Sequence, residues 1–203
     1  MNKVTIAIIP PKEESREIAA RVKDFNKKQG IQHYAYGEII PHISLFYLGD
    51  MPGESIDYMN SPLDLFCLHI QPFEINYGAI HVTDYKTAVI NVRTKYKLRN
   101  LHNDVVDKFK RFYCKYVSPS IDQSKLSDKE LEIVAETGRP YYREFYDPHL
   151  TLERLHSVEQ IQDAKQFFHG LGNFKQDVTK LSLIVENELV TTIYREYDLR
   201  KRL

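Results

Sequence analysis

The sequence predicts an α+β fold made of two lobes, each an antiparallel sheet with a helix packed against it. Two observations indicate this class. Strand-like apolar runs come in neighbouring pairs, and helix-period segments are too few for a parallel, doubly wound sheet. The succession of strand, helix and strand also recurs in the first and last thirds of the chain. A length of 203 residues suits one domain, or two small lobes that share a core.

The first third of the chain is predicted to form strand, helix and strand. Residues Val4 to Ile9 are β-branched and apolar and end at two prolines. Residues Glu13 to Lys28 place apolar side chains at helical spacing among charges, and Gly30 is the expected stop. Ile40 to Leu48 is predicted as a second strand, because turn residues follow an apolar run.

The middle of the chain is predicted to hold a hairpin and a helix. Ile56 to Ile70 is ambiguous, although Pro62 could open a short helix there. Phe73 to Val82 and Thr87 to Arg93 are predicted as strands. Leu98 to Tyr116 has the apolar spacing of a helix.

The last part of the chain begins with a polar insertion. From about 117 to 140 the apolar residues have no regular spacing, and at most a short helix is predicted at 128–135. We expect one bilobal domain over 1–203 that carries this insertion. Beyond it the predicted elements are a strand at Pro148–Leu155, a helix at Val158–Leu171, and closing strands at Leu181–Val185 and Thr191–Leu199.

Composition narrows the function. The formal net charge is zero, so the chain lacks the basic excess of proteins that grip long nucleic acids, and a small or end-on ligand is expected. No apolar stretch is long enough for a membrane span or a signal segment. Cys67 and Cys114 show no metal-binding spacing and are predicted to be reduced and buried. A soluble cytoplasmic protein is therefore expected.

A five-residue pattern occurs twice, as Pro41-His42-Ile43-Ser44-Leu45 and as Pro148-His149-Leu150-Thr151-Leu152. Because residues i and i+2 of a strand share a face, each motif presents an imidazole beside a hydroxyl while its aliphatic residues point into a core. A histidine followed by a hydroxyl residue is a weak signal alone, since His81-Val82-Thr83 matches it too. His81 lacks the preceding proline, so we predict an ordinary strand histidine that could border the cleft.

Two imidazoles and two hydroxyls in one cleft suit phosphodiester chemistry without a metal or cofactor. A neutral imidazole can take a proton from the attacking hydroxyl or water, and an imidazolium can protonate the leaving oxygen. The hydroxyls can donate to the non-bridging phosphate oxygens. We therefore predict His42 and His149 as the acid–base pair and Ser44 and Thr151 as phosphate-binding hydroxyls. The residues do not distinguish the base from the acid.

The two histidines stand 107 positions apart, and their motifs resemble the HxT/S pair of the 2H phosphoesterase superfamily, in the branch of the 2′-5′ RNA ligases and RNA cyclic phosphodiesterases. PHISLFYLGD and PHLTLERL are both similar to that branch, including the basic residue Arg154. The opening strand and the closing YREYDL also resemble the family's ends. The segment GRPYYREFYDPH, which leads into the second motif, and the polar insertion are both longer than the corresponding parts of the family pattern.

The resemblance implies a bilobal, pseudo-two-fold fold around a central cleft. It also implies cleavage or transfer at 2′,3′-cyclic or 2′-5′ phosphodiester bonds, with His42 and His149 as catalytic pair and Ser44 and Thr151 as phosphate-binding residues. A nucleotide or an RNA end is the implied partner, and no obligate protein partner is inferred.

Weaker candidates for substrate contact surround the motifs. Tyr142 and Arg143 belong to an aromatic and basic approach to the second motif, which could stack a base and meet a phosphate, or could equally pack on the second lobe. Arg154 could reach the cleft only if the strand ends or bulges first, because 151 and 154 lie on opposite faces of a regular strand. Tyr194 could edge the pocket, although a core position is commoner.

The basic residues of the central helix region are expected to form its solvated face rather than a guide for RNA phosphates; they are Lys95, Lys97, Arg99, Lys108, Lys110, Arg111 and Lys115. Two other function classes stay open. One is a module that binds nucleotides or RNA ends without turnover, but binding alone needs no acid–base pair. The other is a metal-dependent hydrolase, but the carboxylates of Asp50, Asp147 and Glu153 show no ligand spacing.

Overall fold

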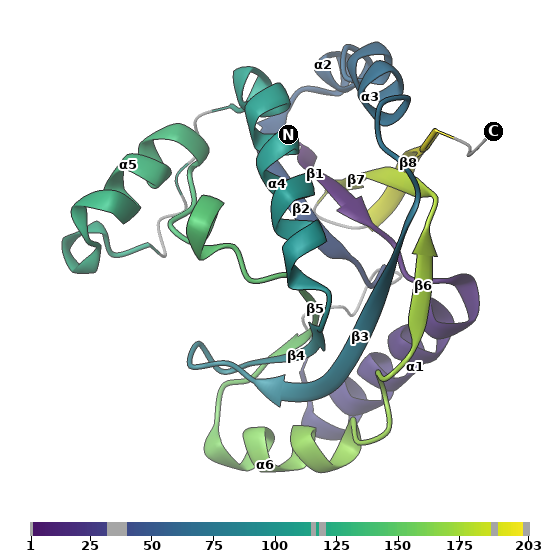
Figure 1. The fold of residues 1–203 in the computed structure, drawn as a ribbon. Coiled ribbons are helices and arrows are strands. Elements are labelled where there is room, and N and C mark those ends of the chain that lie inside the picture. Colours follow the sequence, from purple (N-terminus) through teal and green to yellow (C-terminus); the bar gives the residue numbers. More distant parts are fainter. Residues whose placement is uncertain (1, 32–39, 115–116, 118–120, 188–190, 201–203) are drawn as a thin grey trace.

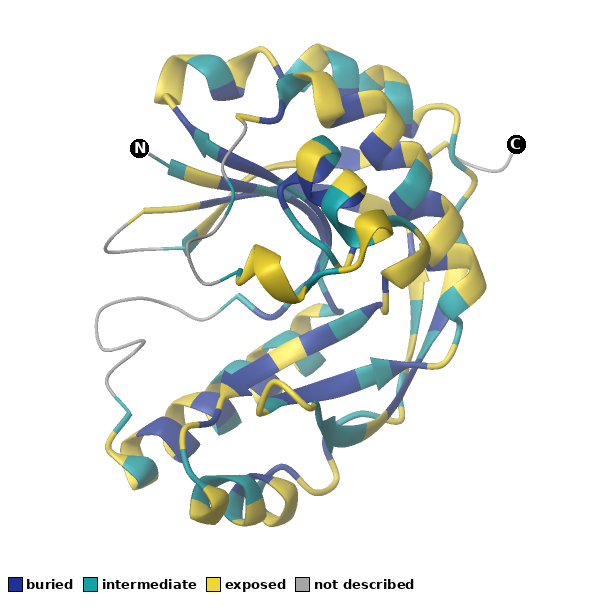
Figure 2. Cartoon of the chain, turned by 90° about the vertical axis from the view of Figure 1, so that its left-hand side faces the viewer, coloured by how far each residue is buried: buried dark blue, intermediate teal, exposed yellow. Residues whose placement is uncertain are grey.

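Two four-stranded antiparallel sheets, each covered by helices on one face, make up the computed structural model (Figure 1). It describes residues 2–31, 40–114, 117, 121–187 and 191–200. The expected α+β class with two sheet-plus-helix lobes is confirmed. Figure 2 shows the sheets converging at an angle, with buried residues running along their strands.

The first sheet joins the two ends of the chain. Its strand order is β2-β1-β7-β8. Helix α4 (Lys95–Phe109) lies against β2, and α3 (Asn60–Cys67) lies against β8. The apolar side chains on this covered face form part of the core. The strands are β1 (Asn2–Ile8), β2 (Ile43–Met51), β7 (Lys180–Glu186) and β8 (Thr191–Asp198).

The second sheet is built from the middle of the chain, in the order β5-β4-β3-β6. Helix α6 (Val158–Phe167) packs on β3 and β4, and α1 (Lys12–Gln29) packs on β5 and α6. The strands are β3 (Phe73–Val82), β4 (Thr87–Val92), β5 (His149–Arg154) and β6 (Lys175–Val178).

Helix α1 therefore does not cover the sheet that holds its flanking strands β1 and β2. Its buried stripe includes Ile18, Val22 and Phe25, and the Phe25 ring lies 4.9 Å from that of Phe168, just beyond α6. Burying this apolar stripe against β5 and α6 stabilises the packing of the two lobes. The lobes are thus interleaved along the chain and do not correspond to its two halves.

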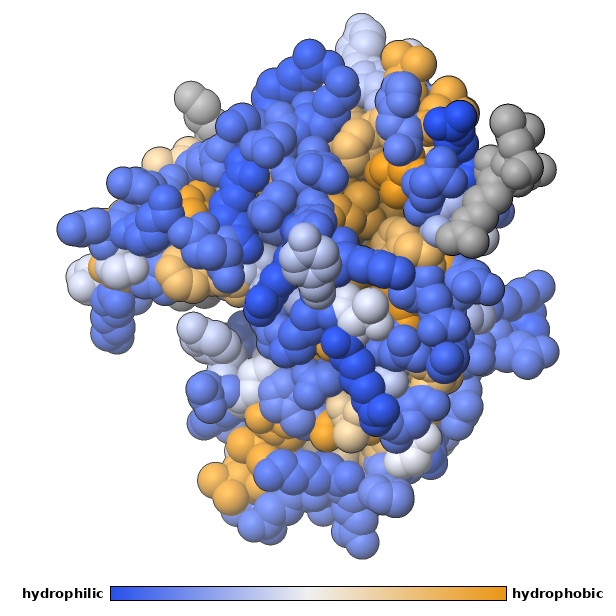
Figure 3. Space-filling view, in the orientation of Figure 1, coloured by the Kyte–Doolittle hydropathy of each residue, from blue (hydrophilic) through white to orange (hydrophobic). Residues whose placement is uncertain are grey.

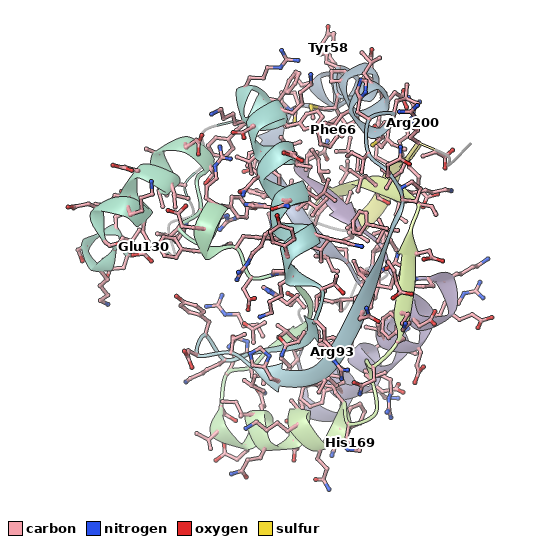
Figure 4. The ribbon with its side chains drawn as sticks, viewed as in Figure 1. Tyr58, Phe66, Arg93, Glu130, His169 and Arg200 are labelled. Atoms are coloured by element: carbon pink, nitrogen blue, oxygen red, sulfur yellow. The ribbon has the colours of Figure 1, made fainter. Side chains whose placement is uncertain are left out.

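In its described residues, the insertion contains one α-helix, α5 (Asp128–Thr137), close to the short helix that the sequence predicts. Ser127 and Glu130 form a reciprocal capping box at its start, and Gly138 ends it in a left-handed conformation. The helix projects beside α4, and Glu130 lies far from the strands of both sheets (Figures 1 and 4).

Several boundaries differ from the sequence prediction. The ambiguous segment forms two short helices, α2 (Gly53–Asp57) and α3, and the central helix ends at Phe109 in a 3-10 turn over Lys110–Phe112. Strand β6 was not predicted, because Lys175–Val178 has no apolar alternation. Cys67 is buried, but Cys114 is exposed, so the prediction that both are buried was wrong. Among the described residues, no helix is long and apolar enough to cross a membrane.

Candidate active site

The two histidine motifs lie on strands that contact each other. β2 and β5 are the outer strands of their respective sheets, and residues of the two strands are neighbours in space. His42 directly precedes β2, and His149 is the first residue of β5. The fold therefore brings together motifs that are 107 positions apart in the sequence. Beside this region, the surface in Figure 3 is indented between α5 and the turn that joins β3 to β4.

The two imidazoles are held in the same way. His42 Nδ1 lies 2.8 Å from the carbonyl oxygen of Ile40, and His149 Nδ1 lies 2.7 Å from that of Asp147. A carbonyl oxygen only accepts hydrogen bonds, so each Nδ1 carries the proton. Nε2 is then the basic atom of each neutral ring, and neither Nε2 has a hydrogen-bond partner among the residues the structure describes.

Each histidine is only partly buried. Burial nevertheless lowers the pKa of His42, and the nearby imidazole of His149 lowers it further. The hydrogen bond to Ile40 and the charge of Glu186 oppose this effect by raising the pKa. The result favours a neutral His42, which is the form that can accept a proton.

The hydroxyls follow their histidines on the uncovered faces of the two sheets. Ser44 pairs with Ala7 on β1, and Thr151 pairs with Val89 on β4. Ser44 is half-buried and Thr151 is exposed. As expected from the strand period, the aliphatic residues of both motifs point into the core and are at most 2% exposed: Ile43, Leu45, Leu150 and Leu152.

Each motif also contains a β-bulge at the same position. The ladder passes from Ser44 to Phe46 without pairing Leu45, and from Thr151 to Glu153 without pairing Leu152. The residue after each hydroxyl is therefore the extra one, and both strands bend just beyond the hydroxyl. The two motifs thus share backbone geometry as well as sequence.

The bulge at Leu152 decides where Arg154 lies. Arg154 pairs with Thr87, and Thr151 pairs with Val89 two positions further along β4. Residues two apart on β4 share a face, so Arg154 and Thr151 share a face as well. The strand therefore bulges before Arg154, as this residue needs in order to approach the site, and Arg154 is exposed.

Tyr142 does not offer its ring to a ligand. It is 4% exposed, and its ring packs edge-on against Phe46 at 5.7 Å. Its hydroxyl accepts a hydrogen bond from the backbone N–H of Tyr47 at 2.9 Å. The expectation of substrate contact is corrected here, because the loop packs on the first lobe.

Arg143 and Tyr194 also have other contacts. The Arg143 guanidinium bonds Glu136 at 2.7 and 2.9 Å and Asp107 at 2.7 Å, and it lowers the pKa of Glu136 to about 2. Tyr194 bonds Asp57 on α2, at the helix-covered side of the first sheet. The Arg143 guanidinium is therefore occupied by two carboxylates of the protein, whereas Tyr194 is 42% exposed, and substrate contact by either residue stays a prediction.

His81 lies on the same face as Thr151, because both residues pair with Val89. Its Nδ1 is buried and has no hydrogen-bond partner among the described residues. It therefore borders the site two strands away from the second motif, at roughly 10 Å by normal strand spacing.

Three basic residues of α4 and of the turn after it bond within the protein, while Lys97, Lys108 and Arg111 are exposed, as expected for a solvated face. Lys95 bonds Asp147 at 2.6 Å, Arg99 donates to the carbonyl oxygen of Tyr146 at 2.9 Å, and Lys110 bonds Glu136 at 2.7 Å. Lys115 lies outside the described residues. Within the described ranges, no three metal-binding side chains gather into a potential metal site.

Two buried residues contact the backbone of the first motif: His102, which the sequence analysis missed, and Tyr146, which belongs to the aromatic segment before His149. His102 lies on the apolar stripe of α4 and bonds the carbonyl oxygen of Leu45 at 2.6 Å. The Tyr146 hydroxyl bonds the carbonyl oxygen of Ser44 at 2.8 Å. The sequence signal for His102 was its position among the regularly spaced apolar residues of the helix. The signal for Tyr146 was the aromatic segment that precedes His149.

Comparison with known proteins yields one family and several solved structures. The family model described as the 2′-5′ RNA ligase superfamily matches residues 10–188. TT0787 of Thermus thermophilus has a TM-score of 0.59 at 14% identity, covering 99% of this chain and 100% of its own. E. coli LigT complexed with 3′-AMP has a TM-score of 0.58 at 14% identity, covering 98% and 99%. LigT complexed with ATP has a TM-score of 0.52 at 16% identity, with the same coverage.

These solved structures share the two-sheet fold with this chain over nearly their entire lengths. No curated protein matches the sequence.

Proposed function

Because the chain belongs to the 2′-5′ RNA ligase superfamily, we propose that it is a metal-independent phosphodiesterase. Its substrates are 2′,3′-cyclic phosphates or 2′-5′ phosphodiester bonds of RNA ends or nucleotides. The observation that carries the proposal is the matched pair of imidazoles. His42 and His149 come from contacting edge strands, donate through Nδ1 to equivalent carbonyls, and keep Nε2 free of partners among the described residues.

In the proposed hydrolysis, His42 is the base, since burial lowers its pKa and favours the neutral ring. A water oxygen forms a bond to phosphorus as its proton passes to His42 Nε2. The bond from phosphorus to one ribose oxygen breaks, and that oxygen keeps the electron pair and takes a proton from His149. The product is a phosphate monoester beside a free hydroxyl. Proton exchange with water then restores both rings.

The hydroxyls hold the reacting phosphate. Ser44 and Thr151 each stand two residues after a catalytic histidine, on the uncovered face of their sheet. Donation to the non-bridging oxygens orients the phosphorus for in-line attack and stabilises charge in the transition state. Arg154, on the same face as Thr151, adds a positive charge for the substrate's phosphates.

A nucleotide ligand has support outside this chain as well. Two of the similar solved structures are of E. coli LigT complexed with 3′-AMP and with ATP. The zero formal charge of this chain agrees with a nucleotide or an RNA end rather than a long duplex.

The test is turnover in excess EDTA, with 2′,3′-cyclic nucleotides and a 2′-5′ dinucleotide as substrates and product identification as readout. The wild type should retain full activity. His42→Ala and His149→Ala should each lower kcat by about 10²- to 10⁴-fold. His169→Ala is the matched control, because that histidine is exposed at the end of α6 (Figure 4).

Three outcomes contradict the proposal. Loss of activity in EDTA with recovery on metal addition indicates a metal-dependent hydrolase. Tight nucleotide binding without turnover indicates the binding module. Full activity in either single variant shows that the two imidazoles do not share the proton transfers.

A further inference from the structure

Strand β2 is an outer strand of the first sheet, and backbone groups in its motif and just after it bond to side chains from elsewhere in the chain. These groups are the carbonyl oxygens of Ser44 and Leu45 and the N–H of Tyr47. Their respective partners are the Tyr146 hydroxyl at 2.8 Å, His102 Nδ1 at 2.6 Å and the Tyr142 hydroxyl at 2.9 Å.

Both ring nitrogens of His102 are hydrogen-bonded inside this cluster. It is 0% exposed, and its ring stacks on Tyr146 with centroids 3.9 Å apart and planes 8° apart. Nδ1 donates to Leu45, while Nε2 accepts from the backbone N–H of Arg143 at 2.9 Å. Only a neutral ring with its proton on Nδ1 can make both bonds. Burial stabilises that form by lowering the pKa of His102 to about 4.

The segment that holds Tyr142 and Tyr146 leads directly into the second motif. Tyr146 stands three residues before His149, and Arg99 holds its carbonyl oxygen at 2.9 Å. Between the two, Asp147 is bonded by Lys95 at 2.6 Å and offers the carbonyl that orients the His149 ring. The segment is therefore fixed to the first motif at Tyr146 and to the second at Asp147.

We propose that Tyr146 and His102 are positioning residues that set the spacing of the two catalytic motifs through the backbone of Ser44 and Leu45. Neither residue touches the substrate. The kinetic part of this inference rests on the proposed function, so its test includes a readout that needs no turnover.

Tyr146→Phe removes one hydroxyl and keeps the ring stacked on His102. Tyr77→Phe is the matched control: Tyr77 is 1% exposed against 5% for Tyr146, and its hydroxyl donates one bond, to Gln176 at 2.7 Å, in the second sheet. Both variants lose one buried hydrogen bond, so similar thermal shifts are expected. A misplacement of the reacting groups by about 1 Å can cost about 100-fold in rate. Tyr146→Phe should lower kcat at least about tenfold at nearly constant KM, and Tyr77→Phe should leave kcat unchanged.

NMR of the imidazole nitrogens supplies the second readout. In Tyr146→Phe the ring signals of His42 should shift, and its titration should move toward that of an exposed imidazole, because its burial and its closeness to His149 change. Tyr77→Phe should leave both unchanged. His102→Asn keeps an N–H donor for Leu45 and should retain more activity than His102→Ala.

The outcomes separate the two proposals. If Tyr146→Phe matches Tyr77→Phe in both kcat and the His42 signals, the positioning role is refuted. If the wild type turns over no phosphodiester while the His42 signals move only in Tyr146→Phe, the positioning role stands and the proposed function fails. Unchanged His42 signals in an inactive protein refute the positioning role as well.

Discussion

Acid should destabilise this protein through one buried histidine. His102 is 0% exposed and makes its two ring hydrogen bonds only as a neutral imidazole. Burial lowers its folded-state pKa from 6.5 to about 4. The unfolded chain therefore binds more protons than the folded protein between these two values, and stability falls as the pH falls through that window.

The size of the effect follows from the pKa difference. A shift of about 2.5 units at about 1.36 kcal/mol per unit corresponds to about 3 kcal/mol of unfolding free energy. This contribution is fully present above about pH 6.5 and is lost by about pH 4. For a domain with a typical stability of roughly 5–15 kcal/mol, the loss is a large fraction of the total.

The assay is urea unfolding of the wild type and of His102→Asn, in steps from about pH 7 to about pH 4.5. The variant has no titrating group at this position. The groups that do not contact His102 titrate in both proteins and cancel in the difference. The wild type should be the more stable protein near neutral pH, and the gap should narrow by about 2–3 kcal/mol toward the acid end. A gap that stays constant over the whole range would refute a neutral, buried His102.

Three further predictions concern turnover. Since burial lowers the pKa of His42, the acid limb of the kcat/KM profile should have its midpoint below about 6.5, and a midpoint above that value would contradict His42 as the base. Ser44→Ala and Thr151→Ala should each lower kcat by about 10- to 1,000-fold in assays with excess EDTA, because each removes one donor to the transition state; unchanged kcat would exclude the role. His81→Ala should leave kcat within a few-fold of the wild type in the same assay, because His81 lies two strands from the second motif; a loss comparable to that of His149→Ala would make it a catalytic residue.

The sequence predicted those parts of the fold in which apolar side chains recur at the regular spacing of a strand or a helix. Phe73–Val82 alternates clearly enough that its strand agrees at both ends, and the burial of Ile43 and Leu150 follows from the motif alone. Strand β6 has no such pattern, since Lys175–Val178 is polar in three of its four residues. Local sequence also could not show that α1 packs on the second sheet, because an amphipathic stripe does not specify its partner.

The only part of the site that could be predicted from the sequence was the histidine and hydroxyl residue repeated in the two motifs. The imidazole and hydroxyl of each motif could be placed on one face from the strand period, but the bulge at Leu152, which returns Arg154 to that face, has no sequence signal. The sequence left open whether Arg143 meets a phosphate or packs within the protein, because its partners Glu136 and Asp107 are set by the tertiary fold.

His102 was missed for the same reason. A histidine on an apolar helix stripe gives no indication of which carbonyl it reaches. Its partner, Leu45, lies 57 positions away, and the fold alone brings the two together.

The most direct measurement is a crystal structure of this protein with inorganic phosphate bound. A single phosphate should lie within about 3 Å of the Nε2 atoms of both His42 and His149, with the hydroxyls of Ser44 and Thr151 donating to its oxygens. A phosphate that contacts only one of the two imidazoles, or that binds away from both motifs, would contradict a shared two-histidine site.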